Sequence, residues 1–181
     1  MKSRRTLKKL MILAISAVMV FAMTACGGKE GGQKEEKGKL YAGYYTAEIP
    51  DDFKVNKTED EFSRPYNDSE TSEEIIKCML DTADSAESLR DYYIEIDTRG
   101  DKEKGEDIVI GDRTWKTLTF IWNGDVPSAM YFTEIDDEHV FQVDTFMMEL
   151  KNEDVMNILK SIKFKKDPVG KARKFAKNLD K

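Results

Sequence analysis

The chain has 181 residues, and its 35 acidic and 29 basic side chains are unevenly distributed. Residues 40–164 carry 30 acidic and 13 basic residues, a net charge of about −17, whereas residues 165–181 carry seven basic and two acidic residues, about +5. Because phosphate binding depends on clustered lysine and arginine, so acidic a segment is a poor partner for nucleic acid. Its length suits one domain and is too short for two.

The first 25 residues have the layout of an export signal. Five basic residues and no acidic ones precede an uncharged run from Leu10 to Met23, which is the basic-then-apolar order of a secretory leader. A membrane-spanning helix needs about 20 apolar residues, so this run is too short for a comfortable permanent span. We therefore expect residues 1–25 to be a signal peptide, and export also argues against nucleic acid as a partner.

The apolar run ends in Met23-Thr24-Ala25-Cys26, which resembles the lipobox of bacterial lipoproteins. In that family the cysteine thiol is lipidated with palmitate-type chains and the signal is cut just before it, here between Ala25 and Cys26. Leucine is usual where Met23 stands, and the alternatives are an ordinary signal peptide or an uncleaved anchor. The resemblance implies a lipid anchor at Cys26 on the outer face of the cell membrane of a bacterium. Gly27 after that cysteine and the lysine-rich segment that follows favour a Gram-positive source.

Residues 26–39 are expected to be a flexible tether. From Gly27 to Lys39 the chain consists of glycine, lysine, glutamate and one glutamine, with no apolar residue. Such a segment cannot bury enough surface to offset the entropy lost on ordering. The folded part is therefore expected to begin at residue 40.

The first half of the folded part predicts strands followed by a helix. Residues 40–49 favour a strand that ends at the turn signal Pro50-Asp51-Asp52, a short edge strand is expected near 61–64, and another strand at 74–80. Asp84 and Glu87 then have the spacing of a helix capping box. The residues expected on the buried side of that helix are Leu89, Tyr92, Tyr93 and Ile96.

The second half predicts a β-meander after a charged loop at 97–107. Three turn signals, at Gly111-Asp112, Asn123-Gly124 and Asp136-Asp137, separate four β-rich runs, so neighbouring strands are expected to be antiparallel. In the second run, Trp115 and Thr117 point one way while Leu118, Phe120 and Trp122 point the other. A strand that is apolar on both faces needs cover on both faces, which predicts a central position.

A helix closes the domain, with Asn152 as its N-cap and Val155, Ile158, Leu159 and Ile162 on one face. The fold class is therefore α+β, an antiparallel sheet of about six strands packed by helices. The opening at 45–53 and the closing segment at 158–164 resemble the PsbP-like fold, over residues 40–164. That resemblance implies a sandwich and a non-enzymatic accessory or assembly role, and it carries over no site residues.

The C-terminal tail, residues 165–181, is basic. Ala172, Phe175, Ala176 and Leu179 have helical spacing with basic residues among them. One interpretation is an amphipathic helix that lies on anionic lipid near the anchor. The other is a frayed terminus or a helix docked on the acidic domain.

Catalytic and metal-binding signatures are absent from the sequence, which contains no GxSxG, HExxH, P-loop or paired CxxC motif. We expect His139 to be packed or at the surface, Cys78 to be a buried free thiol, and neither a metal nor a cofactor. The acidic loop between Asp97 and Asp107 lacks the ligand spacing of a calcium-binding EF-hand, so we interpret it as solvated.

Three aromatic residues remain as candidate binding residues: Trp115, Trp122 and Tyr131. Core packing is the first interpretation of the two tryptophans, because large aromatic side chains dominate buried area. A tryptophan that is exposed beside another aromatic residue would instead be the leading binding anchor.

Two functional hypotheses follow. The favoured one is a membrane-anchored extracytoplasmic lipoprotein acting as a non-catalytic binding or accessory module, whose partner is another envelope protein or a small ligand. The alternative is a small cell-surface hydrolase, which predicts two buried carboxyl groups facing one pocket.

Overall fold

The computed structural model describes residues 39–40, 43–56, 60–66, 72–98, 100–122 and 124–179, which belong to one compact unit spanning residues 33–181. The expected signal peptide, the lipidation site Cys26 and the tether up to residue 38 lie outside these residues. Among the helices of the described part, none is both long and apolar enough to cross a membrane.

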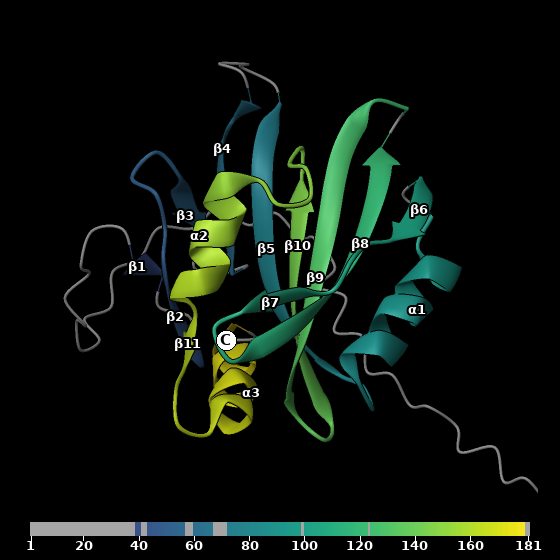
Figure 1. Ribbon diagram of the computed structural model, residues 1–181. Coiled ribbons are helices and arrows are strands. Elements are labelled where there is room, and N and C mark those ends of the chain that lie inside the picture. Colours follow the sequence, from purple (N-terminus) through teal and green to yellow (C-terminus); the bar gives the residue numbers. More distant parts are fainter. Residues whose placement is uncertain are drawn as a thin grey trace, which may run out of the picture. The chain divides into compact units, whose positions relative to one another are not determined.

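The unit contains helices and antiparallel strands, which confirms the α+β class, although there are more strands than the sequence predicts (Figure 1). The helices are α1 (Ala86–Ile96), α2 (Glu153–Ser161) and α3 (Pro168–Leu179). The strands are β1 (Lys39–Leu40), β2 (Tyr45–Glu48), β3 (Lys54–Asn56), β4 (Glu61–Pro65), β5 (Glu73–Thr82), β6 (Asp101–Lys104), β7 (Ile108–Ile110), β8 (Arg113–Trp122), β9 (Val126–Asp136), β10 (His139–Phe146) and β11 (Lys163–Phe164).

Two sheets form. The large sheet has the order β3-β4-β5-β10-β9-β8-β6, with β7 also paired to β8, and the small sheet has the order β1-β2-β11. The predicted meander is confirmed, because β7, β8, β9 and β10 pair antiparallel with their neighbours in sequence. Beyond β10 the sheet continues with β5, which pairs with β10 in unbroken register from Ile75 to Thr82, and then with β4 and β3.

One face of the large sheet, here called the α2 face, carries the larger hydrophobic core. The strands contribute Trp115, Tyr131 and Phe141, all at most 1% exposed, and α2 contributes Val155, Ile158 and Leu159. The small sheet covers the same face through residues such as Tyr45 and Ala47. Burying aromatic side chains of this size supplies much of the apolar area that stabilises a domain.

The opposite face, here called the α1 face, carries a second core under α1. Leu118 and Phe120 of β8, Met130 and Phe132 of β9 and Val140 of β10 pack against Leu89 of the helix. Both faces of β8 are therefore covered, as predicted. β8 is an interior strand, paired with β9 on one side and with β6 and β7 on the other, although β10 is the middle strand of the sheet. Cover on both faces depends on the packed layers, and a strand near the edge can have it as well.

The N-cap of helix α1 lies one residue later in the chain than predicted. Ser85 is the N-cap. Its hydroxyl oxygen accepts a hydrogen bond from the Ser88 backbone N–H, and the Ser88 hydroxyl oxygen accepts one from the Ser85 backbone N–H. The prediction of Asp84 and Glu87 had the right spacing but the wrong register, because Ser and Asp are about equally good caps. Ile96, the last residue of α1, is 50% exposed, so its predicted place on the buried side is wrong.

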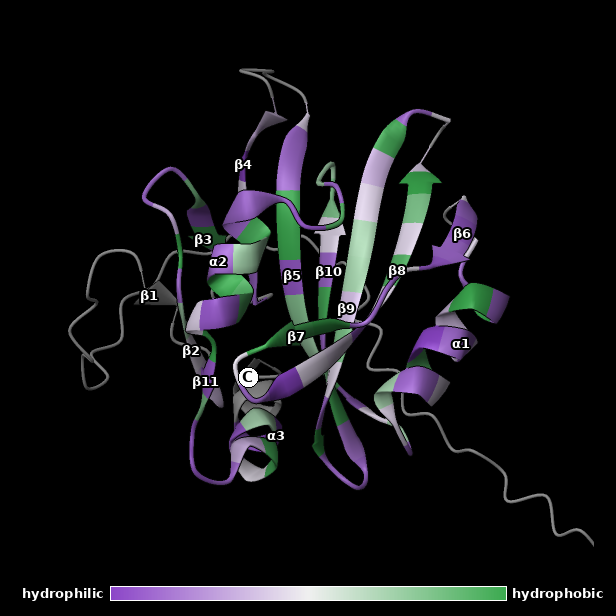
Figure 2. Cartoon of the chain, in the orientation of Figure 1, coloured by the Kyte–Doolittle hydropathy of each residue, from purple (hydrophilic) through white to green (hydrophobic). Residues whose placement is uncertain are grey.

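The charged segment predicted as a loop contains strand β6. Its sequence Asp-Lys-Glu-Lys has no β signal, and Figure 2 shows it as hydrophilic. It pairs with β8 from Asp101 to Lys104 and forms the edge of the large sheet. Charged residues on an edge strand discourage pairing with a further strand from another chain, which explains why an edge strand lacks apolar residues here.

Helix α2 follows its prediction closely. The Asn152 side chain accepts hydrogen bonds from the backbone of Asp154 and Val155, at 3.1 and 3.3 Å. The tail forms helix α3, which begins at Pro168, and Ala172 of this helix packs against the larger core.

Candidate functional site

The three candidate binding aromatics lie in different surroundings. Trp115 is 1% exposed and Tyr131 is fully buried, both within the core of the α2 face. The Tyr131 hydroxyl is also occupied, since it accepts a hydrogen bond from the Lys151 backbone at 3.2 Å. Neither ring can contact a partner without opening the core, so these two positions do not hold as binding anchors. Trp122 is half-buried on the α1 face and is the accessible one of the three.

Trp122 stands between two depressions in the surface. The larger, about 840 Å³, lies toward β6 and is lined by Thr98, Gly100, Asp101, Glu103, Thr119, Phe120, Ile121, Trp122 and Gly124. The smaller, about 200 Å³, lies toward β5 and β10 and is lined by Ile75, Lys77, Trp122, Asp144, Thr145 and Phe146. A tryptophan at such a junction can contact an occupant of either depression.

The smaller depression combines an aromatic pair with charged groups. Trp122 and Phe146 meet edge to face, with ring centroids 5.8 Å apart, although β9 separates their strands. Beside them, Lys77 of β5 and Asp144 of β10 are direct cross-strand partners. An apolar floor with a few charged groups at its border is typical of ligand pockets and of the centres of protein interfaces.

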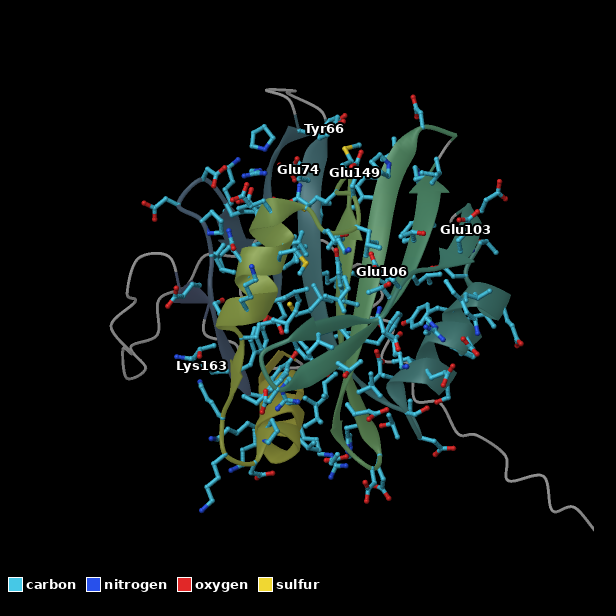
Figure 3. All side chains as sticks on the ribbon, viewed as in Figure 1. Tyr66, Glu74, Glu103, Glu106, Glu149 and Lys163 are labelled. Atoms are coloured by element: carbon cyan, nitrogen blue, oxygen red, sulfur yellow. The ribbon has the colours of Figure 1, made fainter. Side chains whose placement is uncertain are left out.

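The larger depression is acidic and is shaped by a glycine. Gly100 has φ +118°, and a Cβ atom there would lie 2.2 Å from the Ile121 carbonyl oxygen. Only glycine lets the chain pass this close to β8. Ile121 is 44% exposed and lines this depression together with the acidic residues Asp101 and Glu103 of β6. Figure 3 labels Glu103 at this edge. Reasoning from the sequence missed this edge because the charged residues of β6 carry no β-strand pattern.

The α1 face also contains a buried amide without a partner. Gln142 is fully buried on β10, two residues before Asp144. Neither atom of its amide group has a hydrogen bond within the described residues. A buried donor and acceptor without partners lose the hydration they had in water, which costs stability.

A buried carboxyl group, Asp60, lies in a different part of the unit. The Tyr44 and Tyr45 hydroxyls donate to its two oxygens at 2.7 and 2.8 Å, and its backbone carbonyl accepts from the Cys78 amide at 3.0 Å. Burial raises the pKa of Asp60 to about 6, while the two phenol hydrogen bonds lower it. Both carboxyl oxygens therefore connect the start of β2 to the residue that precedes β4, and the backbone carbonyl connects that residue to β5.

The remaining sequence candidates occupy structural positions. Cys78 is buried with a free thiol, and burial raises its pKa well above the ordinary value. His139 lies at the β9–β10 turn, where its Nδ1 is 2.7 Å from Asp136. In the acidic segment, Asp107 binds Lys116 at 2.6 Å and Glu106 binds Lys151. No group of three or more potential metal ligands converges within the part of the chain that the structure describes.

Comparisons with known proteins give a fold likeness without a family. No family model matches the chain, and no curated protein does. Among solved structures, LpqN of Mycobacterium tuberculosis, involved in cell envelope biogenesis, is similar with a TM-score of 0.50 and 12% identity over 74% of this chain and 88% of LpqN.

A protein of Bacteroides thetaiotaomicron is also similar, with a TM-score of 0.41 and 12% identity over 73% of this chain. The present chain spans half the length of that protein. At 12% identity these likenesses concern the fold alone.

Proposed function

We propose that this protein is a lipid-anchored, extracytoplasmic lipoprotein of a bacterial cell envelope whose folded unit is a non-catalytic binding or accessory module. Its basic-then-apolar leader and the lipobox-like Met23-Thr24-Ala25-Cys26 support the anchor. The fold shared with LpqN, a protein of cell envelope biogenesis, fits the location. Membership in the PsbP-like group and a Gram-positive source belong to the same proposal.

The observation that carries the binding role is the position of Trp122. It is the accessible aromatic residue of the three that the sequence singles out, and it lines both depressions. Tryptophan is enriched among the few interface residues that supply most of the binding energy, and such residues lie in apolar surroundings bordered by polar groups. Phe146 and Ile75 provide the apolar part, and Lys77 and Asp144 provide the polar border. The partner is an envelope protein or a small ligand with both apolar and charged groups.

The arrangement of buried carboxyl groups supports this function over a hydrolase. The two described aspartates with strongly raised pKa values are Asp60 and Asp81, each at about 6 because of burial. Both Asp60 oxygens accept phenol hydrogen bonds, and neither aspartate lines either depression beside Trp122. A carboxylate-pair mechanism needs two carboxyl groups on opposite sides of one bound substrate, and no observation on the described residues favours that geometry.

The anchor is tested on the full chain expressed in a bacterium. We expect the protein in the membrane fraction, with the mass of a chain that begins at a diacylated Cys26. A Cys26→Ala variant should lack that mass and should not be processed at this position. A native product with an unmodified thiol at Cys26 would end the lipoprotein proposal.

The binding role is tested by photo-crosslinking. The photoreactive residue benzoylphenylalanine replaces Trp122 in the anchored protein, and products formed in cells are identified by mass spectrometry. The matched control carries the same residue at Val109 of β7, which is 72% exposed and lines neither depression. We expect a discrete product from position 122 that is absent from position 109 and is diminished by Phe146→Asp. Identical products from both positions, or none from position 122, would contradict the proposal.

A further inference from the structure

Positive charge gathers on three consecutive elements at the C-terminal end of the fold. We define the basic pole as Lys160 of α2, Lys163 of β11, Lys166 of the following turn, and Arg173 and Lys174 of α3. All five are exposed. Within the described residues, none of the five side chains forms an ion pair, whereas Arg64 alone binds three carboxylates: Asp52, Glu74 and Asp154.

Two further lysines, Lys165 and Lys171, add to the positive charge of this part of the chain. Lys165 has a lowered pKa, first because of partial burial and then because of repulsion from Lys171. In Figure 3, Lys163 marks this end of the unit, while the labelled Glu74 and Glu149 lie toward the other end. The unit is therefore acidic as a whole with a cluster of exposed cations at one end, and an anionic partner would be attracted to that end.

The first half of helix α3 packs on the domain and leaves its basic residues Arg173 and Lys174 exposed. Asp167 accepts a hydrogen bond from the Gly170 amide and holds the start of the helix, and Ala172 packs against the larger core. The next two residues, Arg173 and Lys174, are exposed. The N-terminal half of the tail is thus docked on the domain, and its contact with an anionic surface would be electrostatic, without insertion of this half into the lipid.

The chain topology brings the tether to the same end. The tether enters the fold at Lys39 of β1, β1 pairs with β2, and β2 pairs with β11, which carries Lys163. A lipid at Cys26 would be joined to Lys39 by 13 residues, which can span at most about 45 Å. Such a tether limits the distance of the unit from the membrane and leaves its orientation free.

We propose that the basic pole binds the anionic phospholipid surface of the membrane and thereby orients the unit. The C-terminal end of β8, which carries Trp122, lies at the opposite end of the sheet from α3 (Figure 1). Docking through the pole therefore directs the Trp122 surface away from the lipid, toward a partner in the envelope. This orientation rests on the proposed anchor and binding role, but the affinity of the pole for anionic lipid does not.

The test uses residues 33–181 without a lipid anchor, the compact unit that contains both hydrophobic cores. Sedimentation with vesicles measures binding to phosphatidylcholine alone and to an equal mixture with phosphatidylglycerol. We expect binding to the anionic vesicles only, and its loss when salt rises from about 0.1 M to about 1 M, because the screening length falls from about 10 Å to about 3 Å.

Two double variants with the same change in net charge separate the pole from overall charge. Lys163→Ser with Lys174→Ser removes two cations of the pole. Lys104→Ser with Lys151→Ser removes two half-exposed cations that are paired with Asp91 and Glu106, and surface pairs of this kind contribute little to stability. We expect about a fivefold loss of affinity for each charge removed from the pole, and less than about a twofold loss for the control pair. Circular dichroism confirms that both variants are folded.

Three results would overturn the inference. They are equal binding to neutral and anionic vesicles, equal losses for the two double variants, and binding to soluble polyphosphate without binding to phosphatidylglycerol vesicles. The last would identify the partner as a polyanion other than the membrane. Because the tested unit has no anchor, each of these failures would leave the proposed lipoprotein and its Trp122 surface untouched.

Discussion

The buried carboxyl group of Asp60 makes a testable contribution to the pH dependence of stability. Asp60 is 5% exposed, and burial raises its pKa from 3.8 to about 6 against the lowering effect of the Tyr44 and Tyr45 hydroxyls. The folded state therefore holds a proton at pH values where the unfolded chain has released it. The resulting stabilisation is complete below pH 3.8 and is lost as the pH rises through about 6.

The magnitude follows from the size of the rise. A pKa unit corresponds to about 1.4 kcal/mol, so the rise from 3.8 to about 6 corresponds to about 3 kcal/mol of unfolding free energy. The Asp60→Asn variant has no titrating group at this position and can still form hydrogen bonds with both phenols. Between about pH 3.5 and about pH 7, we expect the unfolding free energy of the unchanged chain to fall by about 3 kcal/mol more than that of the variant.

The measurement is urea denaturation of residues 33–181 at a series of pH values, followed by fluorescence. Comparing the variant with the unchanged chain cancels other titrating groups, including Asp81, whose pKa is also raised to about 6, and Asp91 and Asp136, whose pKa values are lowered. Tyr44→Phe removes a donor that stabilises the ionised carboxylate, so it should cost more stability at pH 7 than in acid. If Asp60→Asn has the same pH profile as the unchanged chain, the buried carboxyl does not titrate as described.

Three further predictions concern single positions. Gly100→Ala should lower the unfolding free energy by about 1–3 kcal/mol more than Gly111→Ala does. Both glycines have positive φ, but only at Gly100 would the new Cβ meet backbone atoms, those of Ile121. Equal losses in urea denaturation would contradict the close approach. Gln142→Met should stabilise the unit by about 1 kcal/mol, because it removes a buried amide that has no partner among the described residues; a loss of stability would show that the amide is satisfied. Cys78, the single cysteine of residues 33–181, should react with a thiol reagent only after unfolding. The side chain is 3% exposed, and burial raises the pKa of its thiol. Rapid reaction of the native unit would contradict that burial.

Local sequence patterns determined much of this fold. The turn signals of the meander, the Asn152 cap of α2 and the alternation of Trp115 and Leu118 on β8 all depend on neighbouring residues, and the structure bears them out. Such features are readable because turn chemistry and side-chain alternation are properties of short segments. The expectations for the leader and Cys26 also come from short patterns, and they remain predictions.

Tertiary structure decided what local patterns could not. Strand β6 forms because its charged residues lie at the edge beside β8, where pairing needs no apolar side chain. Trp115 and Trp122 lie on one strand but on opposite faces of the sheet. The packing of α2 and the small sheet buries Trp115, whereas the core under α1 leaves Trp122 partly accessible. The hydrogen bonds of Tyr44 and Tyr45 to Asp60 also form only when the chain folds. The same holds for the basic pole, because burial and charge clustering depend on contacts between distant segments.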